Sequence, residues 1–97
     1  MIIRIVKMTF QLEKVDEFIH LFNESKELIR SMSGCKHLEL LNDIQAKEVY
    51  FTYSYWNSEN DLNNYRNSEV FAKVWSETKV LFSAKPEAWS VEQKIVL

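Results

Sequence analysis

The chain has 97 residues, of which 46% are hydrophobic and 27% charged, and this predicts one domain, residues 1–97, that buries about two-thirds of its extended surface. The net charge of −2, with acids and bases interspersed, excludes the basic surface of a nucleic-acid-binding protein, and the single cysteine, Cys35, excludes a disulfide scaffold. No apolar run has the roughly 20 residues of a membrane-spanning helix and no signal peptide is recognisable, so we expect a cytoplasmic protein with no membrane or nucleic-acid partner.

The first half of the chain predicts a strand, a helix and a second strand. Residues Ile2 to Phe10 are apolar and β-branched on both faces, which is typical of a covered strand. From about Glu13 to Met32, apolar residues recur every three or four positions, as in an amphipathic helix. Gly34 follows where a left-handed cap would end that helix. Cys35 to Leu41 alternates apolar and polar side chains, and this pattern predicts the second strand.

The second half predicts a strand, a helical region and a last strand. The strand from about Glu48 to Trp56 follows a short turn, so we expect it to pair with its predecessor as an antiparallel hairpin. Ser58, with Asp61 three residues later, has the spacing of a helix-capping pair. The helical region extends to about Phe82 and is predicted to be divided near Arg66. Ala88 to Leu97 alternates again and predicts a strand that reaches the end of the chain.

This order of elements predicts an α+β fold of the ferredoxin-like βαββαβ type, with a four-stranded antiparallel sheet and two helices on one face. Nothing in the sequence covers the other face, where the third strand is expected to place Phe51, Tyr53 and Tyr55. An exposed apolar sheet face favours association. We therefore expect a homodimer that forms through the sheet face.

The stretch from Trp56 to Phe71 resembles the antibiotic biosynthesis monooxygenase-like family of small dimeric α+β barrel proteins. The residues that match the family pattern are Trp56, Ser58, Leu62, Ser68 and Phe71. The order of strands and helices matches over essentially the whole chain. The resemblance implies that two subunits form a dimeric α/β barrel and that the protein is a cofactor-independent monooxygenase. Two histidines that are common in the family are replaced here by Tyr65 and Val70.

The run from Asn63 to Phe71 is also similar to a helix of the haem-degrading members of this family. In those members a Trp is followed, ten residues later, by a His that ligates iron. Tyr65 and Trp75 occupy these two places. Because an indole offers only an N–H donor, it cannot ligate iron, so no haem is expected. No cluster of residues has metal-ligand spacing either, and we predict no cofactor.

The resemblance implies a candidate site around the second helical region, where relatives hold their substrates. Tyr65 and Arg66 are the predicted catalytic residues, since a guanidinium stabilises a developing oxyanion and a phenol can hold a phenolate oxygen. The predicted substrate-binding residues are Trp56, Trp75, Tyr53 and His37. Such a pocket suits a small, flat aromatic molecule, because rings stack on rings.

Each of these residues also has a structural interpretation. Trp56 and Trp75 have the spacing of core residues. His37 lies two residues from Glu39, which suits a base and its orienting partner but is common in strands without a site. Tyr53 belongs either to a barrel lining that reaches the pocket or to the packing of a dimer.

Three functions remain open from the sequence. The first is a monooxygenase for an aromatic or quinol-like molecule, in which the substrate's own carbanion reduces oxygen. The second is a dimeric small-molecule-binding or stress-associated protein of the same fold, without catalysis. The third is a heat- or redox-linked isomerase, which requires a general base that the sequence does not identify.

Overall fold

Four antiparallel strands form one sheet in the order β2-β3-β1-β4. The computed structural model, which describes residues 1–97, gives their bounds as β1 Ile2–Thr9, β2 Cys35–Asn42, β3 Val49–Trp56 and β4 Glu87–Glu92. β1 pairs with both β3 and β4, and β2 pairs with β3, always in antiparallel orientation. The two central strands are therefore β3 and β1.

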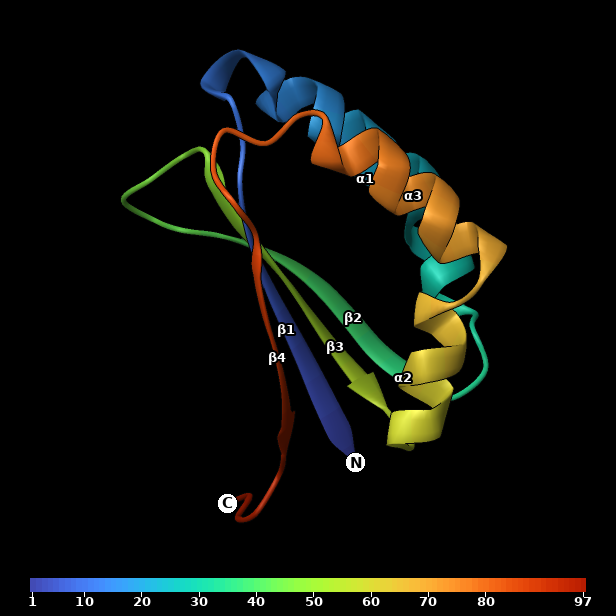
Figure 1. Ribbon diagram of the computed structural model, residues 1–97. Helices are drawn as coiled ribbons and strands as arrows, with labels where there is room; N and C mark the ends of the chain where they lie inside the picture. The colour runs from blue at the N-terminus through green and yellow to red at the C-terminus, as the bar shows by residue number, and fades with distance from the viewer.

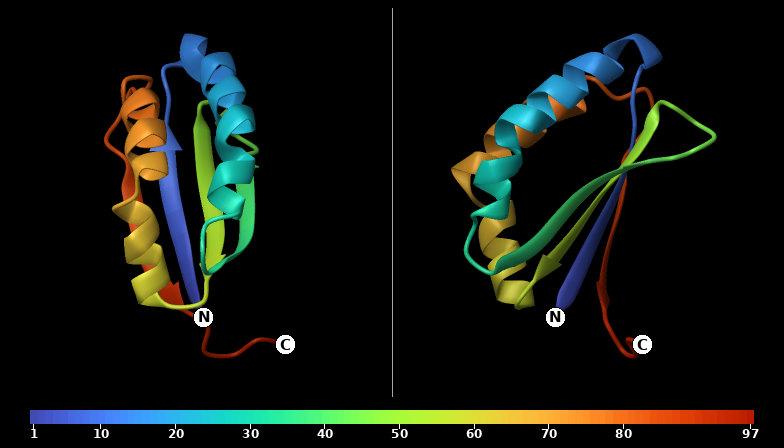
Figure 2. Two further views of the ribbon diagram at one scale, coloured as in Figure 1. Left: turned by 90° about the vertical axis from the view of Figure 1, so that its right-hand side faces the viewer. Right: turned by 180° about the vertical axis from the view of Figure 1, so that it is seen from behind.

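Three α-helices cover one face of this sheet (Figure 1). They are α1 Val15–Arg30, α2 Glu59–Arg66 and α3 Glu69–Lys79, and a short 3-10 helix, Leu12–Lys14, precedes α1. α1 and α3 lie side by side, and no element lies on the opposite face of the sheet (Figures 1 and 2). This is the α+β, ferredoxin-like arrangement, so the predicted fold class is confirmed. No helix combines the length and hydropathy that crossing a membrane requires.

Side-chain caps explain why the second helical region is divided in two. The Ser58 hydroxyl accepts a hydrogen bond of 3.1 Å from the backbone N–H of Asp61 at the start of α2. The Ser68 hydroxyl accepts an equivalent bond, also 3.1 Å, from the N–H of Phe71 at the start of α3. Each cap satisfies an N–H group that the helix itself leaves unpaired. The predicted division near Arg66 is confirmed.

Gly34 has the only positive φ in the chain, +84°. The prediction that it caps the first helix was wrong, because α1 ends at Arg30, earlier than the expected Met32, and Gly34 lies in the turn before β2. A Cβ atom at this position would lie 2.4 Å from the Asp61 side chain. The glycine is thus required for a turn conformation and for a close approach to the start of α2.

β4 ends at Glu92, so the prediction of a strand that reaches Leu97 was also wrong. The reason is the register, in which Glu92 pairs with Ile2, the first residue of β1. Residues beyond Glu92 have no backbone partner on the neighbouring strand. α3 likewise ends at Lys79, before the predicted Phe82, which instead forms an isolated bridge with Phe10.

The buried side chains form two clusters between helices and sheet. One contains Met8, Phe10, Phe18 and Leu81, and the other contains Cys35, Trp56 and Leu62. Burial of a large apolar side chain stabilises a fold by about 1.5–3 kcal/mol. Since Met8 lies near the end of β1 and Trp56 pairs with its first residue, the two clusters occupy opposite ends of the sheet.

Because successive side chains of a strand point to opposite faces, a second set of apolar side chains lies on the uncovered face of the sheet. These residues, which we call the open face, are Ile3, Ile5, Leu41, Phe51, Tyr53, Tyr55, Trp89 and Val91. Ile5 lies between Tyr53 and Trp89, and Ile3 lies between Tyr55 and Val91. The predicted position of the three β3 aromatic residues on one uncovered face is confirmed.

Candidate functional site

A cavity of about 310 Å³ lies between the sheet and the helices. It is bordered by members of both buried clusters, Met8 and Phe18 from one and Trp56 and Leu62 from the other. Most of its lining is hydrophobic. Its volume is at the lower end of the range of about 300–1,000 Å³ for ligand pockets. The cavity therefore suits a small, mostly apolar molecule.

Trp56 forms a fixed wall of this cavity. Its side chain is fully buried, at 0% exposure. The indole Nε1–H donates a hydrogen bond of 3.0 Å to the Ser54 hydroxyl. The Tyr65 ring stacks on the indole, with ring centroids 5.0 Å apart. Trp56 is thus a core residue, as its spacing in the sequence suggested, and it also lines the predicted site.

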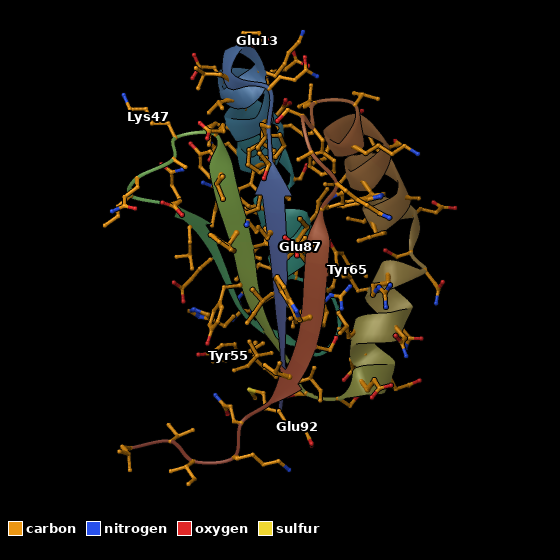
Figure 3. All side chains as sticks on the ribbon, turned by 60° about the vertical axis from the view of Figure 1, so that its left-hand side comes forward. Glu13, Lys47, Tyr55, Tyr65, Glu87 and Glu92 are labelled. Atoms are coloured by element: carbon orange, nitrogen blue, oxygen red, sulfur yellow. The ribbon has the colours of Figure 1, made fainter.

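Tyr65, in the last turn of α2, carries the cavity's phenol (Figure 3). No protein group forms a hydrogen bond with the Tyr65 hydroxyl. The backbone carbonyl of Tyr65 accepts a hydrogen bond of 2.6 Å from the Ser68 hydroxyl. Burial, and to a lesser extent the nearby Cys35, raises the pKa of the Tyr65 phenol. The phenol is therefore protonated at neutral pH, and it offers a hydrogen-bond donor that a ligand could use.

A row of aromatic rings continues from Tyr65 along α3. The Phe71 ring meets the Tyr65 ring edge-on, with centroids 5.2 Å apart, and stacks on Trp75 at 5.8 Å. All three side chains line the cavity. Such rings favour stacked or edge-on contact with another ring. The row therefore offers several orientations of contact to a flat aromatic ligand.

Arg4 and Arg66 are the only charged residues that line the cavity. Arg4 projects from the middle of β1 and its Nη1 donates to the Ser90 hydroxyl at 3.0 Å. Arg66 is the last residue of α2 and its side chain is exposed. Burial, and second the Arg66 guanidinium, lowers the pKa of Arg4. The cavity is thus positively charged and contains no carboxylate.

The structure does not bring Tyr53 and His37 to this cavity, since both lie on the opposite side of the sheet. Tyr53 pairs with Ile5, and His37 pairs with Tyr55, whose ring lies 4.9 Å from the imidazole. His37 Nε2 contacts Glu39. Of the six predicted site residues, Trp56, Tyr65, Arg66 and Trp75 share the cavity, and the other two belong to or border the open face.

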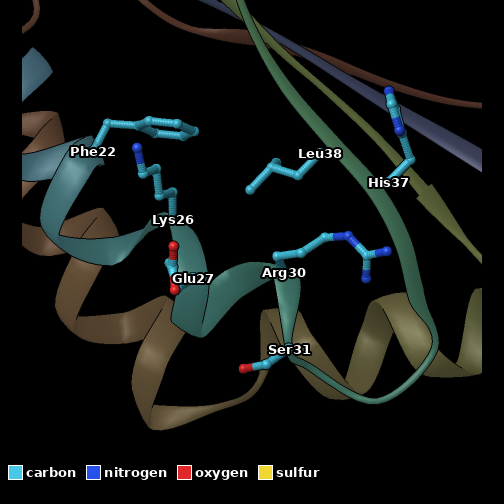
Figure 4. A pocket seen from close by; sticks show the side chains of 7 residues that line it. All are labelled: Phe22, Lys26, Glu27, Arg30, Ser31, His37 and Leu38. Atoms are coloured by element: carbon cyan, nitrogen blue, oxygen red, sulfur yellow. The ribbon is translucent and has the colours of Figure 1, made fainter.

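A second hollow of about 560 Å³ is an open groove between α1 and β2 (Figure 4). Lys26, Glu27 and Arg30 line it, and all three are exposed. His37 also borders this groove, from β2 (Figure 4). Although this groove is larger, it lacks the enclosed apolar walls of a ligand site. We therefore take the aromatic cavity as the candidate site.

Cys35 carries the chain's only thiol and does not line the cavity. Cys35 is buried beside Trp56 and Leu62, and burial raises the pKa of its thiol, so it remains a protonated, mainly apolar side chain. No three His, Cys, Asp or Glu side chains gather where they could hold a metal ion.

Arg4 was missed in the sequence analysis. A signal for it does exist, because it is the one charged residue on the face of β1 that also carries Ile2, Val6 and Met8. A lone cation among apolar side chains on a covered strand face is unusual, since a buried charge requires partners. That signal becomes specific only when the helices are known to cover this face.

Comparisons with known proteins agree with the fold. The family model described as antibiotic biosynthesis monooxygenase matches residues 1–75. A conserved protein from Methanosarcina mazei is 22% identical, with a TM-score of 0.90 over 96% of this chain and 93% of its own. A Bordetella bronchiseptica protein, proposed to be an antibiotic biosynthesis monooxygenase, is 21% identical, with a TM-score of 0.86 over 98% of this chain and 97% of its own. No curated protein sequence matches.

Proposed function

Because the chain belongs to the antibiotic biosynthesis monooxygenase family, we propose that it is a cofactor-independent monooxygenase that oxidises a small aromatic or quinol-like molecule. The observation that carries this proposal is the aromatic cavity, in which the protonated Tyr65 phenol has no protein partner. The substrate's rings lie among Trp56, Phe71 and Trp75. Its phenolic or enolic oxygen accepts the hydrogen bond that Tyr65 donates.

For an anthrone-type substrate, the reaction is the conversion of an activated CH2 group to a carbonyl. The CH2 group loses a proton to water and becomes a carbanion, and the carbanion adds O2 and takes up a proton to give a hydroperoxide (C–OOH). Loss of one water from the H–C–OOH group then gives C=O. The oxygen of the carbanion's enolate form is held by Tyr65, and the Arg66 guanidinium opposes its negative charge. Exclusion of water by the apolar walls strengthens the hydrogen bond from Tyr65, whereas Arg66 acts from an exposed position.

Oxygen uptake with a panel of anthrones and quinols, in metal-free buffer, tests this proposal. We expect turnover by the native protein and a loss of at least about tenfold in Tyr65→Phe and Arg66→Ala, since each removes a group that faces the developing charge. Tyr50→Phe, which removes a hydroxyl outside the cavity, is the matched control and should retain activity. An absence of turnover on the whole panel would contradict the proposal.

A second function is favoured by one specific observation, namely that the cavity lining contains no His, Asp or Glu that could act as a base. The alternative is a non-catalytic dimeric small-molecule-binding or stress-associated protein. Under this alternative, an aromatic ligand raises the melting temperature in a saturable way but is recovered unchanged. The enzyme proposal instead requires that the same ligand be consumed together with oxygen.

The open face supports the further proposal of a homodimer in which two sheets face each other as a dimeric α/β barrel. Trp89 and Val91 leave 45% and 41% of their surface exposed. Charged side chains near this face are paired, as in the ion pair between Lys7 and Glu87. An apolar centre with a paired polar border is the pattern of a protein interface.

A further inference from the structure

The cavity carries more positive charge than is needed to balance the single negative charge that forms in the proposed reaction. The lining carries two guanidinium groups, Arg4 and Arg66, and no carboxylate. Neither arginine belongs to any ion pair in the chain. The enolate of the proposed substrate supplies only one negative charge. One positive charge in the cavity is therefore left without a counter-charge, although the chain as a whole has a net charge of −2.

Arg4 is the arginine that the surrounding structure holds in place. It lies between Ser54 of β3 and Ser90 of β4 in the sheet register. Its single side-chain hydrogen bond, to the Ser90 hydroxyl, leaves most of its five N–H donors available. Glu92, which follows on the same face of β4, lies 3.4 Å from Lys94 and forms no pair with Arg4.

A half-buried guanidinium without a counter-ion is costly, because apolar walls solvate a cation poorly. The Arg66 guanidinium increases that cost, and the lowered pKa of Arg4 has the same two causes, burial first and Arg66 second. A bound anion would relieve both. The planar fork of a guanidinium matches a carboxylate or a phosphate in two parallel hydrogen bonds. The mostly apolar lining and the volume of about 310 Å³ favour the smaller carboxylate, which carries a single charge.

We propose that the substrate is an aromatic acid whose carboxylate binds Arg4 on the sheet side of the cavity, with Arg66 as the second positive charge. This inference rests on the proposed use of the cavity for substrate, and it deepens that proposal by naming the substrate class. The rings of the acid contact the row formed by Tyr65, Phe71 and Trp75. Arg4 is thus a substrate-positioning group that determines specificity.

Binding of two matched probes tests the inference without any need for turnover. 2-Naphthoate carries the carboxylate, and 2-naphthamide is its neutral isostere. We expect the native protein to bind the acid about tenfold or more tightly than the amide, as a charge-assisted pair would provide. Arg4→Gln should remove this preference and leave the affinity for the amide unchanged. Calorimetric titration at neutral pH measures all the affinities.

Lys73→Gln is the control, because it removes one positive charge from an exposed position of α3 outside the cavity. This variant should retain the preference for the acid. Arg66→Gln, at an exposed helix end, should reduce the preference and supplies a second test if Arg4→Gln does not fold. An undiminished preference for the acid in Arg66→Gln would contradict the proposed pair.

The outcomes separate this inference from the proposed function. Equal affinity of the native protein for acid and amide would overturn the aromatic-acid inference while leaving the cavity as an aromatic site. Equal loss of both ligands in Arg4→Gln would show a merely structural role for Arg4 and would also overturn it. Binding of neither probe to the native protein would contradict both the use of the cavity and the inference.

Discussion

The phenol ring of Tyr65 lies nearly flat against the indole of Trp56, with centroids 5.0 Å apart and 19° between the ring planes. The indole is itself held by its hydrogen bond to Ser54. The stack therefore fixes the ring of Tyr65 while its hydroxyl remains free of protein partners. A donor that is oriented in advance loses little freedom when it binds a charged oxygen.

The raised pKa of Tyr65 predicts a loss of stability at alkaline pH. Below about pH 10 the phenol is neutral in both folded and unfolded chains, so it makes no pH-dependent contribution. Above that pH the unfolded chain loses the proton first, and the folded state becomes less stable. Tyr65→Phe should therefore lose less stability than the native protein between about pH 9 and 11. Urea unfolding of both proteins over this range measures the difference, and parallel curves would count against the assigned burial.

Truncation of the two cavity tryptophans should have unequal effects on stability. Trp56→Ala removes a fully buried side chain and leaves a cavity, so we expect a loss of about 3–5 kcal/mol in the free energy of unfolding. Trp75 is only partly buried, so Trp75→Ala should lower the free energy of unfolding clearly less. Urea denaturation at neutral pH compares them. Equal losses would mean that Trp56 is not the fixed wall described above.

Gly34→Ala should destabilise the protein by about 1–3 kcal/mol, because the alanine backbone would have to adopt a left-handed conformation that a Cβ atom disfavours. It would also meet the Asp61 side chain at 2.4 Å, and Asp61 is the residue whose N–H the Ser58 cap binds. Chemical denaturation measures the loss. The neighbouring Ser33→Ala, in the same turn, is the control and should change stability by no more than about 0.5 kcal/mol. An equal effect of the two variants would contradict the requirement for glycine.

Ile5→Lys should dissociate the proposed dimer. Ile5 lies at the centre of the open face, between Tyr53 and Trp89, and two opposed subunits would each bury an unpaired ammonium group there. Light scattering coupled to size-exclusion chromatography should show dimers for the native protein and monomers for the variant. Lys36→Glu, at an exposed position of β2, should remain dimeric. A native monomer at micromolar concentration would refute the dimer directly.

Local patterns were sufficient to predict the elements and their order. Ser58 with Asp61 marked the start of α2, and the alternation of residues in β3 placed Phe51, Tyr53 and Tyr55 on one face of the sheet. The end of β4 could not be predicted in the same way, since it depends on Ile2 being the first residue of β1. A strand ends where its partner ends, and that relationship connects residues at opposite ends of the sequence.

The same limit explains the site. Simple alternation places Cys35 and His37 on one face of β2, but the register shifts between them, so that Cys35 contacts the buried cluster and His37 lies opposite Tyr55. Such a bulge leaves no clear signal in a single sequence. Arg4 and Arg66 share a cavity only because the helices cover the sheet face that carries Arg4, which is a property of packing rather than of local pattern.

The most direct test of the account is to follow isotopic oxygen into the product of a substrate that the native protein turns over. Incubation with ¹⁸O2 in ordinary water should give a product carbonyl that carries one ¹⁸O atom, with the second atom of the molecule released as water. A control in H2¹⁸O under ordinary oxygen should leave the product unlabelled. A carbonyl oxygen derived from water, or a ligand recovered unchanged, would contradict the assignment of this cavity as a monooxygenase site.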